Sequence, residues 1–372
     1  MNIGIDARML GSGFGLARYT QQLAQHLLEA ETTHTYVLFL RKDNWDNVLP
    51  HKRIKKVLAD IPWYSVAEQV QLPKLLNKEK LDVMHFPHWN VPLFYTGTFV
   101  VTIHDLIMYH FPRPEATTLG PVKFFIKDKI HRIVLRNAVK KAKHILVTSE
   151  FTKRDVAKRL QVKEEKMTTT YQAPFTLEEE QVGQDAKQVL EKYHISKPYV
   201  MYVGAAYPHK NLDRLVDAWQ VFQETYGNTH QLVLVGKENY FYTKLQEKIN
   251  GLNSVVYTGF VPDEELVALY KKAKLYVFPS LYEGFGIPPL EAMQYGIPVV
   301  SSSATCLPEV LGGAAIYVDP LHIEGMAEAI HRGLDDIDAR YAVKEEAKIL
   351  LQKYSWSKLA CETVRVYESV DV

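Results

Sequence analysis

Residues 275–291 constrain the fold of this chain most strongly, because they combine a strand, a glycine-rich loop and a helix start. The first letters, LYVF, form a short apolar run that is typical of a buried parallel strand. The loop SLYEGFG follows, and two prolines then precede LEAMQYG, whose apolar spacing suits a helix. In open α/β sheets, ligands bind where a strand's carboxyl end meets the next helix. The stretch therefore predicts a parallel α/β fold with a ligand site at 280–291.

Two glutamates, Glu283 and Glu291, flank this loop. A carboxylate only accepts hydrogen bonds, which suits it to the vicinal hydroxyls of a sugar. Gly284 and Gly286 let the backbone approach a ligand closely, and the free N–H groups of the helix start can bind a phosphate. The pattern indicates a site for a diphosphate that carries a hexose and a ribose, with one carboxylate on each sugar. In the alternative interpretation, Glu283 caps the helix and Glu291 lies on its solvated face.

The unit E-G-F-G-I-P-P-L-E resembles the E-x7-E signature of the retaining glycosyltransferases of family 4. Further segments resemble the family in the same order along nearly the whole chain: MNIGIDARML, TIHD, VTSEFTKRDV, YVGAAYPHKNLDRL and YTGFVPDEEL. The resemblance implies the GT-B fold, which is α/β with two Rossmann-like domains whose parallel sheets face each other across a deep cleft. It also implies that a C-terminal helix crosses back to the first domain.

Strand-like runs alternate with helical patterns in both halves of the chain, and the pattern restarts after a polar segment at 172–198. We therefore expect an N-terminal Rossmann-like domain at 1–172, completed by the C-terminal helix 356–372. A second Rossmann-like domain is expected at 173–355. The resemblance implies that the first domain binds the acceptor and that the second binds the nucleotide-sugar donor.

The bulk composition excludes some functions. A formal net charge of +1 gives no electrostatic reason to expect nucleic acid as a partner. Two cysteines, Cys306 and Cys361, argue against a disulfide framework and fit a reducing cytosol. We identify neither an apolar run long enough to span a bilayer nor a signal peptide. The expected location is cytoplasmic, with peripheral attachment to the inner face of the cell membrane as an option.

Three residues are expected to be catalytic. His104 follows a predicted strand in TIHD, and the resemblance implies that it lies beside the transferred sugar, positions the donor and stabilises the transition state. Lys210 lies where a loop turns into a helix, and its point charge can neutralise a leaving diphosphate without a metal. Glu283 would hold the sugar hydroxyls. The alternatives are a packed histidine at 104 and a solvated helix-start lysine at 210.

The expected donor-binding residues lie in four segments: Gly13, Gly15, His209, Lys210, Asn211, Val261, Glu283, Gly284, Phe285, Gly286, Ile287, Leu290 and Glu291. The family usually has an arginine directly before the lysine that corresponds to Lys210, whereas this chain has His209 there. The second cation for the diphosphate could therefore be His209, Arg8 or Arg18. The loop GSGFG does not have the spacing of a dinucleotide-binding motif, because that motif would need glycine at Leu16. A plain strand-to-helix turn is the alternative there.

The acceptor is expected to contact His88, Trp89 and Asp105, which follow two predicted strands, although the loop that carries His88 and Trp89 could also be purely structural. Residues 122–144 interleave lysines and arginines with apolar residues, as a basic amphipathic helix on an anionic membrane would. A core-packed helix with a solvated basic face is the alternative. The only D-x-D, at Asp336 and Asp338, lies in a charged helical stretch, and we interpret it as a solvated face and not as a metal site.

Taken together, the resemblance implies a retaining, metal-independent hexosyltransferase (EC 2.4.1.-) that needs no cofactor and uses a nucleotide diphosphate sugar as co-substrate. The chain looks most like bacterial mannosyltransferases of surface polysaccharide or glycolipid synthesis. This favours GDP-mannose as the donor and a glycan or lipid-linked acceptor, with a UDP-hexose as the alternative donor. A nucleotide-sugar epimerase and a non-catalytic nucleotide-sugar-binding protein are the alternatives from other classes.

Overall fold

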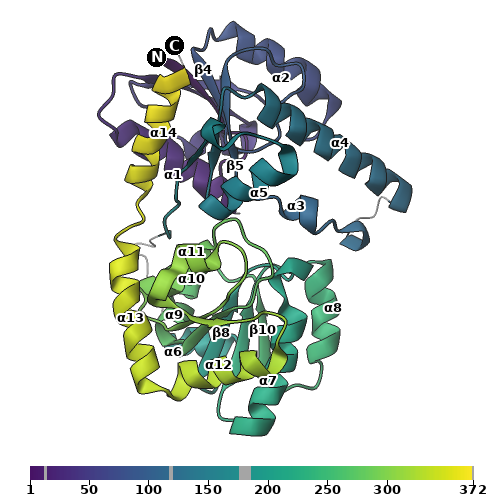
Figure 1. The fold of residues 1–372 in the computed structure, drawn as a ribbon, viewed down its shortest axis with the longest axis vertical. Coiled ribbons are helices and arrows are strands. Elements are labelled where there is room, and N and C mark those ends of the chain that lie inside the picture. The colour runs from purple at the N-terminus through teal and green to yellow at the C-terminus, as the bar shows by residue number, and fades with distance from the viewer. Residues whose placement is uncertain (12–14, 117–119, 176–185, 371–372) are drawn as a thin grey trace. The chain divides into compact units, whose positions relative to one another are not determined.

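The computed structural model describes residues 1–11, 15–116, 120–175 and 186–370 (Figure 1). The chain divides into two compact units. Unit 1 comprises Met1–Gln172 and Ser355–Val372, and unit 2 comprises Ala173–Tyr354. Each unit is built on one sheet in which neighbouring strands are parallel. The expected pair of Rossmann-like domains with parallel sheets is therefore confirmed.

Unit 1 contains a seven-stranded sheet in the order β3-β2-β1-β4-β5-β6-β7. Its strands are β1 (Asn2–Asp6), β2 (Thr35–Leu40), β3 (Ile54–Leu58), β4 (Val83–Phe86), β5 (Phe99–Ile103), β6 (His144–Val147) and β7 (Met167–Thr169). Strands β4 and β5 are buried along their whole length, as the continuous apolar runs predict. The chain adds strands on one side of β1 up to β3 and then continues on the other side with β4, so the topological switch point lies between β1 and β4.

Six helices of unit 1 lie within the described residues, and serine caps mark the starts of two of them. They are α1 (Gly15–Glu29), α2 (Val66–Lys78), α3 (Ile107–His110), α4 (Gly120–Lys141), α5 (Glu150–Leu160) and α14 (Trp356–Val370), with short 3-10 turns at Lys42–Asn47, Pro114–Ala116 and Glu164–Lys166. Ser65 and Ser149 cap α2 and α5, since each hydroxyl accepts a hydrogen bond from the backbone N–H three residues later.

The C-terminal helix α14 belongs to unit 1 and lies beside α1 (Figure 1). The rings of Trp356 and Tyr19, one from each helix, lie 6.1 Å apart between centroids. The hydroxyl of Tyr367 lies 2.6 Å from Nδ1 of His85 on β4, and both side chains are fully buried. These contacts confirm that the C-terminal helix packs on the first domain.

Unit 2 contains a six-stranded sheet in the order β10-β9-β8-β11-β12-β13. Its strands are β8 (Tyr199–Val203), β9 (Gln231–Val235), β10 (Val255–Gly259), β11 (Leu275–Phe278), β12 (Val299–Ser302) and β13 (Ile316–Val318). Its helices are α6 (Ala186–Lys192), α7 (Leu212–Tyr226), α8 (Tyr240–Ile249), α9 (Asp263–Lys272), α10 (Ile287–Gln294), α11 (Leu307–Leu311), α12 (Ile323–Asp335) and α13 (Ile337–Leu351), with 3-10 turns at Pro208–Lys210 and Gly312–Ala314. By the same reasoning, the switch point of this sheet lies between β8 and β11.

Three observations bear on metals and membranes. The carboxylate of Asp336 accepts a hydrogen bond from the Ala339 N–H at 2.9 Å and so caps α13, a contact that the interpretation as a solvated face did not include. Within the described residues, no group of three histidine, cysteine, aspartate or glutamate side chains could hold a metal ion. None of the described helices is long and apolar enough to cross a membrane.

Candidate active site

In unit 2, the loops that follow β8 and β11 bring Lys210 and Glu283 together at the switch point. The Lys210 Nζ lies 2.6 Å from the Glu283 Oε1, and the two side chains are only 17% and 8% exposed. Lys210 ends the 3-10 turn after β8, and its ammonium lies 5.4 Å from the centre of the Phe278 ring at the end of β11. The pair places a cation suited to a phosphate beside a carboxylate suited to sugar hydroxyls.

The loop that carries Glu283 is braced by residues 305 and 306, which precede α11. The Glu283 N–H donates to the Thr305 Oγ1 at 3.2 Å, and the Cys306 Sγ donates to the carbonyls of Glu283 and Phe285 at 3.3 Å each. Thr305 has φ +59°, an unfavourable conformation for a β-branched residue. Burial raises the pKa of the Cys306 thiol well above its ordinary value, so the thiol keeps the proton that it donates. Sequence reasoning missed both residues, because no motif marks them.

Helix α10 begins directly after this loop. Gly286 has φ +96°, and a Cβ added there would lie 2.8 Å from the Leu307 Cδ2, so this position requires glycine. Ile287 is the first helical residue, and proline follows it in the first turn, where the backbone N–H groups have no intrahelical partner. The side chain of Leu290 is fully buried in the core, and that of Phe285 packs edge-on against Tyr354.

Glu291 lies in the second turn of α10 and is half-buried. Its Oε2 accepts a hydrogen bond of 3.4 Å from the hydroxyl of Tyr270 on α9. Burial, together with the neighbouring Glu291 carboxylate, raises the pKa of Tyr270 well above its ordinary value, so the phenol stays protonated and remains a donor. The contact holds the carboxylate in a fixed orientation, which a purely solvated face would not do.

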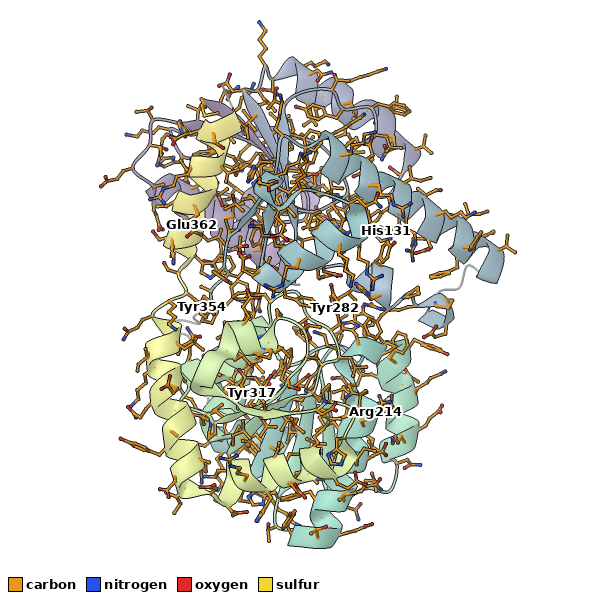
Figure 2. All side chains as sticks on the ribbon, in the orientation of Figure 1. His131, Arg214, Tyr282, Tyr317, Tyr354 and Glu362 are labelled. Carbon is orange, nitrogen blue, oxygen red and sulfur yellow. The ribbon has the colours of Figure 1, made fainter. Side chains whose placement is uncertain are left out.

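Asn211 joins three loops of unit 2. It has φ +64°, and its Nδ2 donates to the carbonyls of Pro279 at 3.1 Å and Pro320 at 2.7 Å. Its Oδ1 accepts a hydrogen bond of 2.9 Å from Arg214, which Figure 2 labels on α7. The side chain is therefore committed to the scaffold, and so is the backbone, because the Asn211 N–H donates to the Pro208 carbonyl and the Asn211 carbonyl accepts from the Leu215 N–H.

The other expected donor-binding residues are more scattered. His209 is 2% exposed, its ring stacks on Tyr207, and its carbonyl accepts a hydrogen bond from the Leu281 N–H at 2.7 Å. Val261 is buried just beyond β10. Gly15 is the first residue of α1 in unit 1, and Gly13 lies outside the described residues.

In unit 1, His104 follows β5, and its partners determine its protonation state. Its Nε2 lies 2.8 Å from the Pro87 carbonyl, which only accepts, so this nitrogen carries the proton. Its Nδ1 then accepts a hydrogen bond of 3.1 Å from the Gln172 side-chain amide, and no sequence motif marks this partner. Burial lowers the pKa of His104 to about 4, so the ring is neutral at pH 7. His104 could therefore act through its ring, but not as a cation, and its carbonyl already accepts a hydrogen bond of 2.7 Å from the Thr148 Oγ1.

The three expected acceptor residues lie in the loops after β4 and β5. The Asp105 carboxylate accepts a hydrogen bond from the Ile107 N–H at 2.8 Å, at the start of α3. The rings of His88 and Trp89 lie 4.7 Å apart, and the Trp89 ring lies 4.3 Å from that of His131, which Figure 2 labels on α4. Burial lowers the pKa of His88 to about 3, so this ring is neutral as well.

A pocket opens at the switch point of unit 1, beside this loop. It is lined by Asp6, Arg8, Met9, Leu16, Thr20, Trp63, Pro87, His88 and Asn90. The Arg8 guanidinium, which is fully buried, lies 2.7 Å from a carboxylate oxygen of Asp6 and 2.7 Å from one of Glu68. Two carboxylates thus neutralise Arg8, which disfavours it as the second phosphate cation. Of the expected acceptor residues, His88 lines this pocket, while Trp89 and Asp105 do not.

The sheet order and the sites at the carboxyl ends of the strands place this chain in the class of two-domain α/β enzymes. Family comparisons make this assignment specific. Residues 15–173 match the model described as glycosyltransferase family 4, and residues 186–349 match the model described as glycosyl transferases group 1. The chain belongs to this family of retaining glycosyltransferases and is therefore a transferase of class EC 2.4.1.-.

Individual relatives agree with this assignment. The chain is 28% identical to the O-antigen chain mannosyltransferase B of Escherichia coli, over 95% of this chain and 96% of the relative. It is 29% identical to the O-antigen chain mannosyltransferase RfbU of Salmonella typhimurium, over 79% of each chain.

Solved structures share the GT-B fold. Sucrose-phosphate synthase from Thermosynechococcus elongatus is similar with a TM-score of 0.74 and 21% identity, over 100% of this chain and 99% of that one. Anabaena Alr3699/HepE, solved in complex with UDP and glucose, is similar with a TM-score of 0.75 and 16% identity, over 99% of this chain and 100% of that one.

Proposed function

We propose that this glycosyltransferase moves mannose from GDP-mannose to a glycan or lipid-linked acceptor and retains the configuration at the anomeric carbon. The observation that carries the proposal is the pair of Lys210 and Glu283 at the switch point of unit 2. The O-antigen mannosyltransferase relatives support mannose as the sugar. The neighbour solved with UDP and glucose supports a nucleotide-sugar donor and keeps a UDP-hexose as the alternative.

In this proposal, unit 2 binds the donor. The Lys210 ammonium and the N–H groups of Gly286 and Ile287 at the start of α10 neutralise the departing diphosphate, so the donor site requires no metal. Pro288 and Pro289 carry no N–H and contribute no donor. Glu283 accepts hydrogen bonds from the sugar hydroxyls, and Glu291, oriented by Tyr270, accepts them from the ribose. The hydrogen bond from the Glu283 N–H to the Thr305 Oγ1 would hold Glu283 in position to contact the sugar.

Unit 1 would bind the acceptor in the proposed reaction. The acceptor oxygen forms a bond to the anomeric carbon as the bond from that carbon to the phosphate oxygen breaks. The leaving phosphate accepts the acceptor's proton on the same face of the sugar, so no side chain has to act as a base. His104, neutral and held by Pro87 and Gln172, would position the transferred sugar.

We also propose that the protein attaches to the inner face of the cell membrane through α4. Five apolar side chains of this helix, Val122, Phe125, Ile126, Ile130 and Ile133, are each between 53% and 70% exposed. Their spacing places them along one side of the helix, and exposed lysines such as Lys123 and Lys127 lie between them. A helix with this composition fits the interface of an anionic bilayer. The core-packed alternative describes only the later part of α4, where residues such as Val134 and Leu135 are buried.

Donor turnover tests the proposed function against its rivals. A glycosyltransferase releases GDP from GDP-mannose slowly alone and faster with an acceptor glycan, and the product carries the mannose. An epimerase would convert the donor's sugar without any acceptor, and a non-catalytic protein would bind the donor without turnover. Either of those results would overturn the proposal.

A further inference from the structure

We infer that Tyr354 is a positioning residue of the donor site: it fixes the loop between Glu283 and α10 from the point where the chain leaves unit 2. The inference rests on the proposed function, because this loop would hold the transferred sugar and the diphosphate. Tyr354 acts through Phe285 and is not itself a ligand contact.

The first argument is where the chain passes between the units. It does so twice, after Gln172 and after Tyr354. Gln172 donates a hydrogen bond of 3.1 Å to the Nδ1 of His104 in unit 1. The ring of Tyr354, labelled in Figure 2, packs edge-on against Phe285 in unit 2, with 5.5 Å between the centroids and 85° between the planes. At both crossings, the last residue of the unit is therefore attached to a residue of the candidate site.

The second argument is how the donor loop is anchored. Phe285 lies between Gly284 and Gly286, so its ring is the one side chain that can hold residues 284–286 by packing. This ring is 4% exposed. The Glu283 carboxylate precedes it, and the N–H groups of Gly286 and Ile287 follow it. Displacement of the Phe285 ring would therefore move the proposed sugar and diphosphate contacts together.

The third argument is a second contact, made by the Tyr354 hydroxyl. It donates a hydrogen bond of 2.7 Å to the carbonyl of Val310 in the last turn of α11, where helix carbonyls have no intrahelical partner. Burial raises the pKa of Tyr354 well above its ordinary value, so the hydroxyl keeps the proton that it donates. Residues 305 and 306, which brace the Glu283 loop, directly precede α11. Tyr354 thus supports the loop both through Phe285 and through α11.

The fourth argument is the length of the connection. One residue, Ser355, separates Tyr354 from Trp356, the first residue of α14. The Trp356 ring lies 6.1 Å from the ring of Tyr19 on α1, so α14 is anchored in unit 1 at its first residue. A connection of one residue between two packed rings has little slack. Displacement of one ring is therefore passed to the other and, through Tyr354, to the donor loop.

The test compares Tyr354→Leu, which loses the ring and the hydroxyl, with Tyr354→Phe, which keeps the ring. Tyr317→Leu is the matched control, because the Tyr317 side chain is also half-buried and its hydroxyl donates to the Gly312 carbonyl just after α11 at 2.6 Å. Hydrogen exchange of the amides of residues 282–287 is measured by mass spectrometry on the full chain without nucleotide. Tyr354→Leu should speed it by about 3- to 10-fold, and the other two variants by less than about 2-fold.

The same proteins are then assayed with GDP-mannose and an acceptor glycan. In Tyr354→Leu, kcat/KM for the donor should fall by about 10- to 100-fold, because small displacements of the reacting groups are costly in the transition state. Tyr354→Phe should stay within about 3-fold of wild type. The affinity of Tyr354→Leu for GDP should fall while its affinity for guanosine, which has no diphosphate, stays unchanged. A general loss of structure would lower both affinities.

Equal exchange rates or equal kcat/KM values for Tyr354→Leu and Tyr317→Leu would overturn the inference. So would a Tyr354→Phe variant as impaired as Tyr354→Leu, because the ring contact with Phe285 would then not be the cause. If loop exchange responds as expected but wild type neither binds nor turns over any nucleotide sugar, the proposed function fails while the positioning of the loop by Tyr354 stands.

Discussion

Lys210 and Glu283 form an ion pair of 2.6 Å although 73 positions separate them in the chain. The pairing of β8 with β11 explains the contact, because each residue lies in the loop that follows one of these two neighbouring strands. The two charges neutralise each other in a mostly buried position. A bound nucleotide sugar would offer each of them a separate partner.

Replacing Lys210 by methionine should remove the cation while keeping the length of the side chain. We expect kcat to fall by about 100- to 1,000-fold, because the departing diphosphate loses its point charge. Affinity for GDP should fall more than affinity for guanosine, which has no phosphate. Lys197→Met, at an exposed lysine of the same unit that pairs with Asn228, is the control. A Lys210→Met enzyme with wild-type kcat would contradict the role assigned to this residue.

The Arg8 network should be important for stability. Arg8→Met leaves the carboxylates of Asp6 and Glu68 without their shared cation, so the free energy of unfolding should fall by about 3–5 kcal/mol. The surface pair of Lys42 and Asp60 provides the control, and Lys42→Met should cost about 1 kcal/mol or less. Urea denaturation measures both, and equal losses in the two variants would refute the prediction.

The buried histidines should make stability depend on pH. Burial lowers the pKa values of His85 and His88 to about 3 and that of His104 to about 4, all below the unfolded value near 6.5. Below pH 6.5 the unfolded chain binds protons that the folded chain does not, so the unfolding free energy falls as pH decreases from 6.5 towards 4. Each histidine should contribute up to about 2 kcal/mol of this loss between pH 7 and pH 5.

The variant His104→Gln should reduce that loss, whereas His51→Gln, at an exposed position, should leave it unchanged. Urea denaturation of the variants and wild type at pH 7 and pH 5 gives the comparison. The account of buried, neutral histidines is wrong if His104→Gln loses as much stability as wild type.

Membrane attachment should depend on the exposed apolar side of α4. The double variant Phe125→Ser, Ile130→Ser should reduce co-sedimentation with vesicles that contain anionic phosphatidylglycerol, because both side chains are more than half exposed and would enter the interface. Wild type should bind purely zwitterionic vesicles more weakly, and salt should weaken its binding to the anionic ones. Ile349→Ser, at an exposed isoleucine of unit 2, is the matched control. Unchanged binding of the double variant would contradict the proposal.

Local patterns predicted much of the fold. The apolar runs at Val83–Phe86, Phe99–Ile103 and His144–Val147 are strands, because buried parallel strands are continuous in apolar residues. The strand Ile54–Leu58 was not predicted, since its two lysines interrupt the apolar pattern and it lies at the edge of the sheet.

Less of the candidate site than of the fold could be predicted from the sequence. Glu283 and Lys210 lie in segments that resemble a known signature, whereas Thr305 and Gln172 lie in none. Their roles come from contacts between distant parts of the chain, such as the bond from Gln172 to His104 across 68 positions. The pairing of the strands creates these contacts, and no local spacing of residues reports them.

The most direct measurement of the central claim is a thermal-shift series of the full chain with GDP, UDP, ADP and their sugar conjugates, without added metal. A ligand that binds only the folded state raises the melting temperature. We predict a shift with GDP and GDP-mannose that is reduced in Glu291→Ala, because the ribose loses its carboxylate. A shift with UDP compounds alone would replace the proposed donor, and no shift with any nucleotide would contradict the donor site in unit 2.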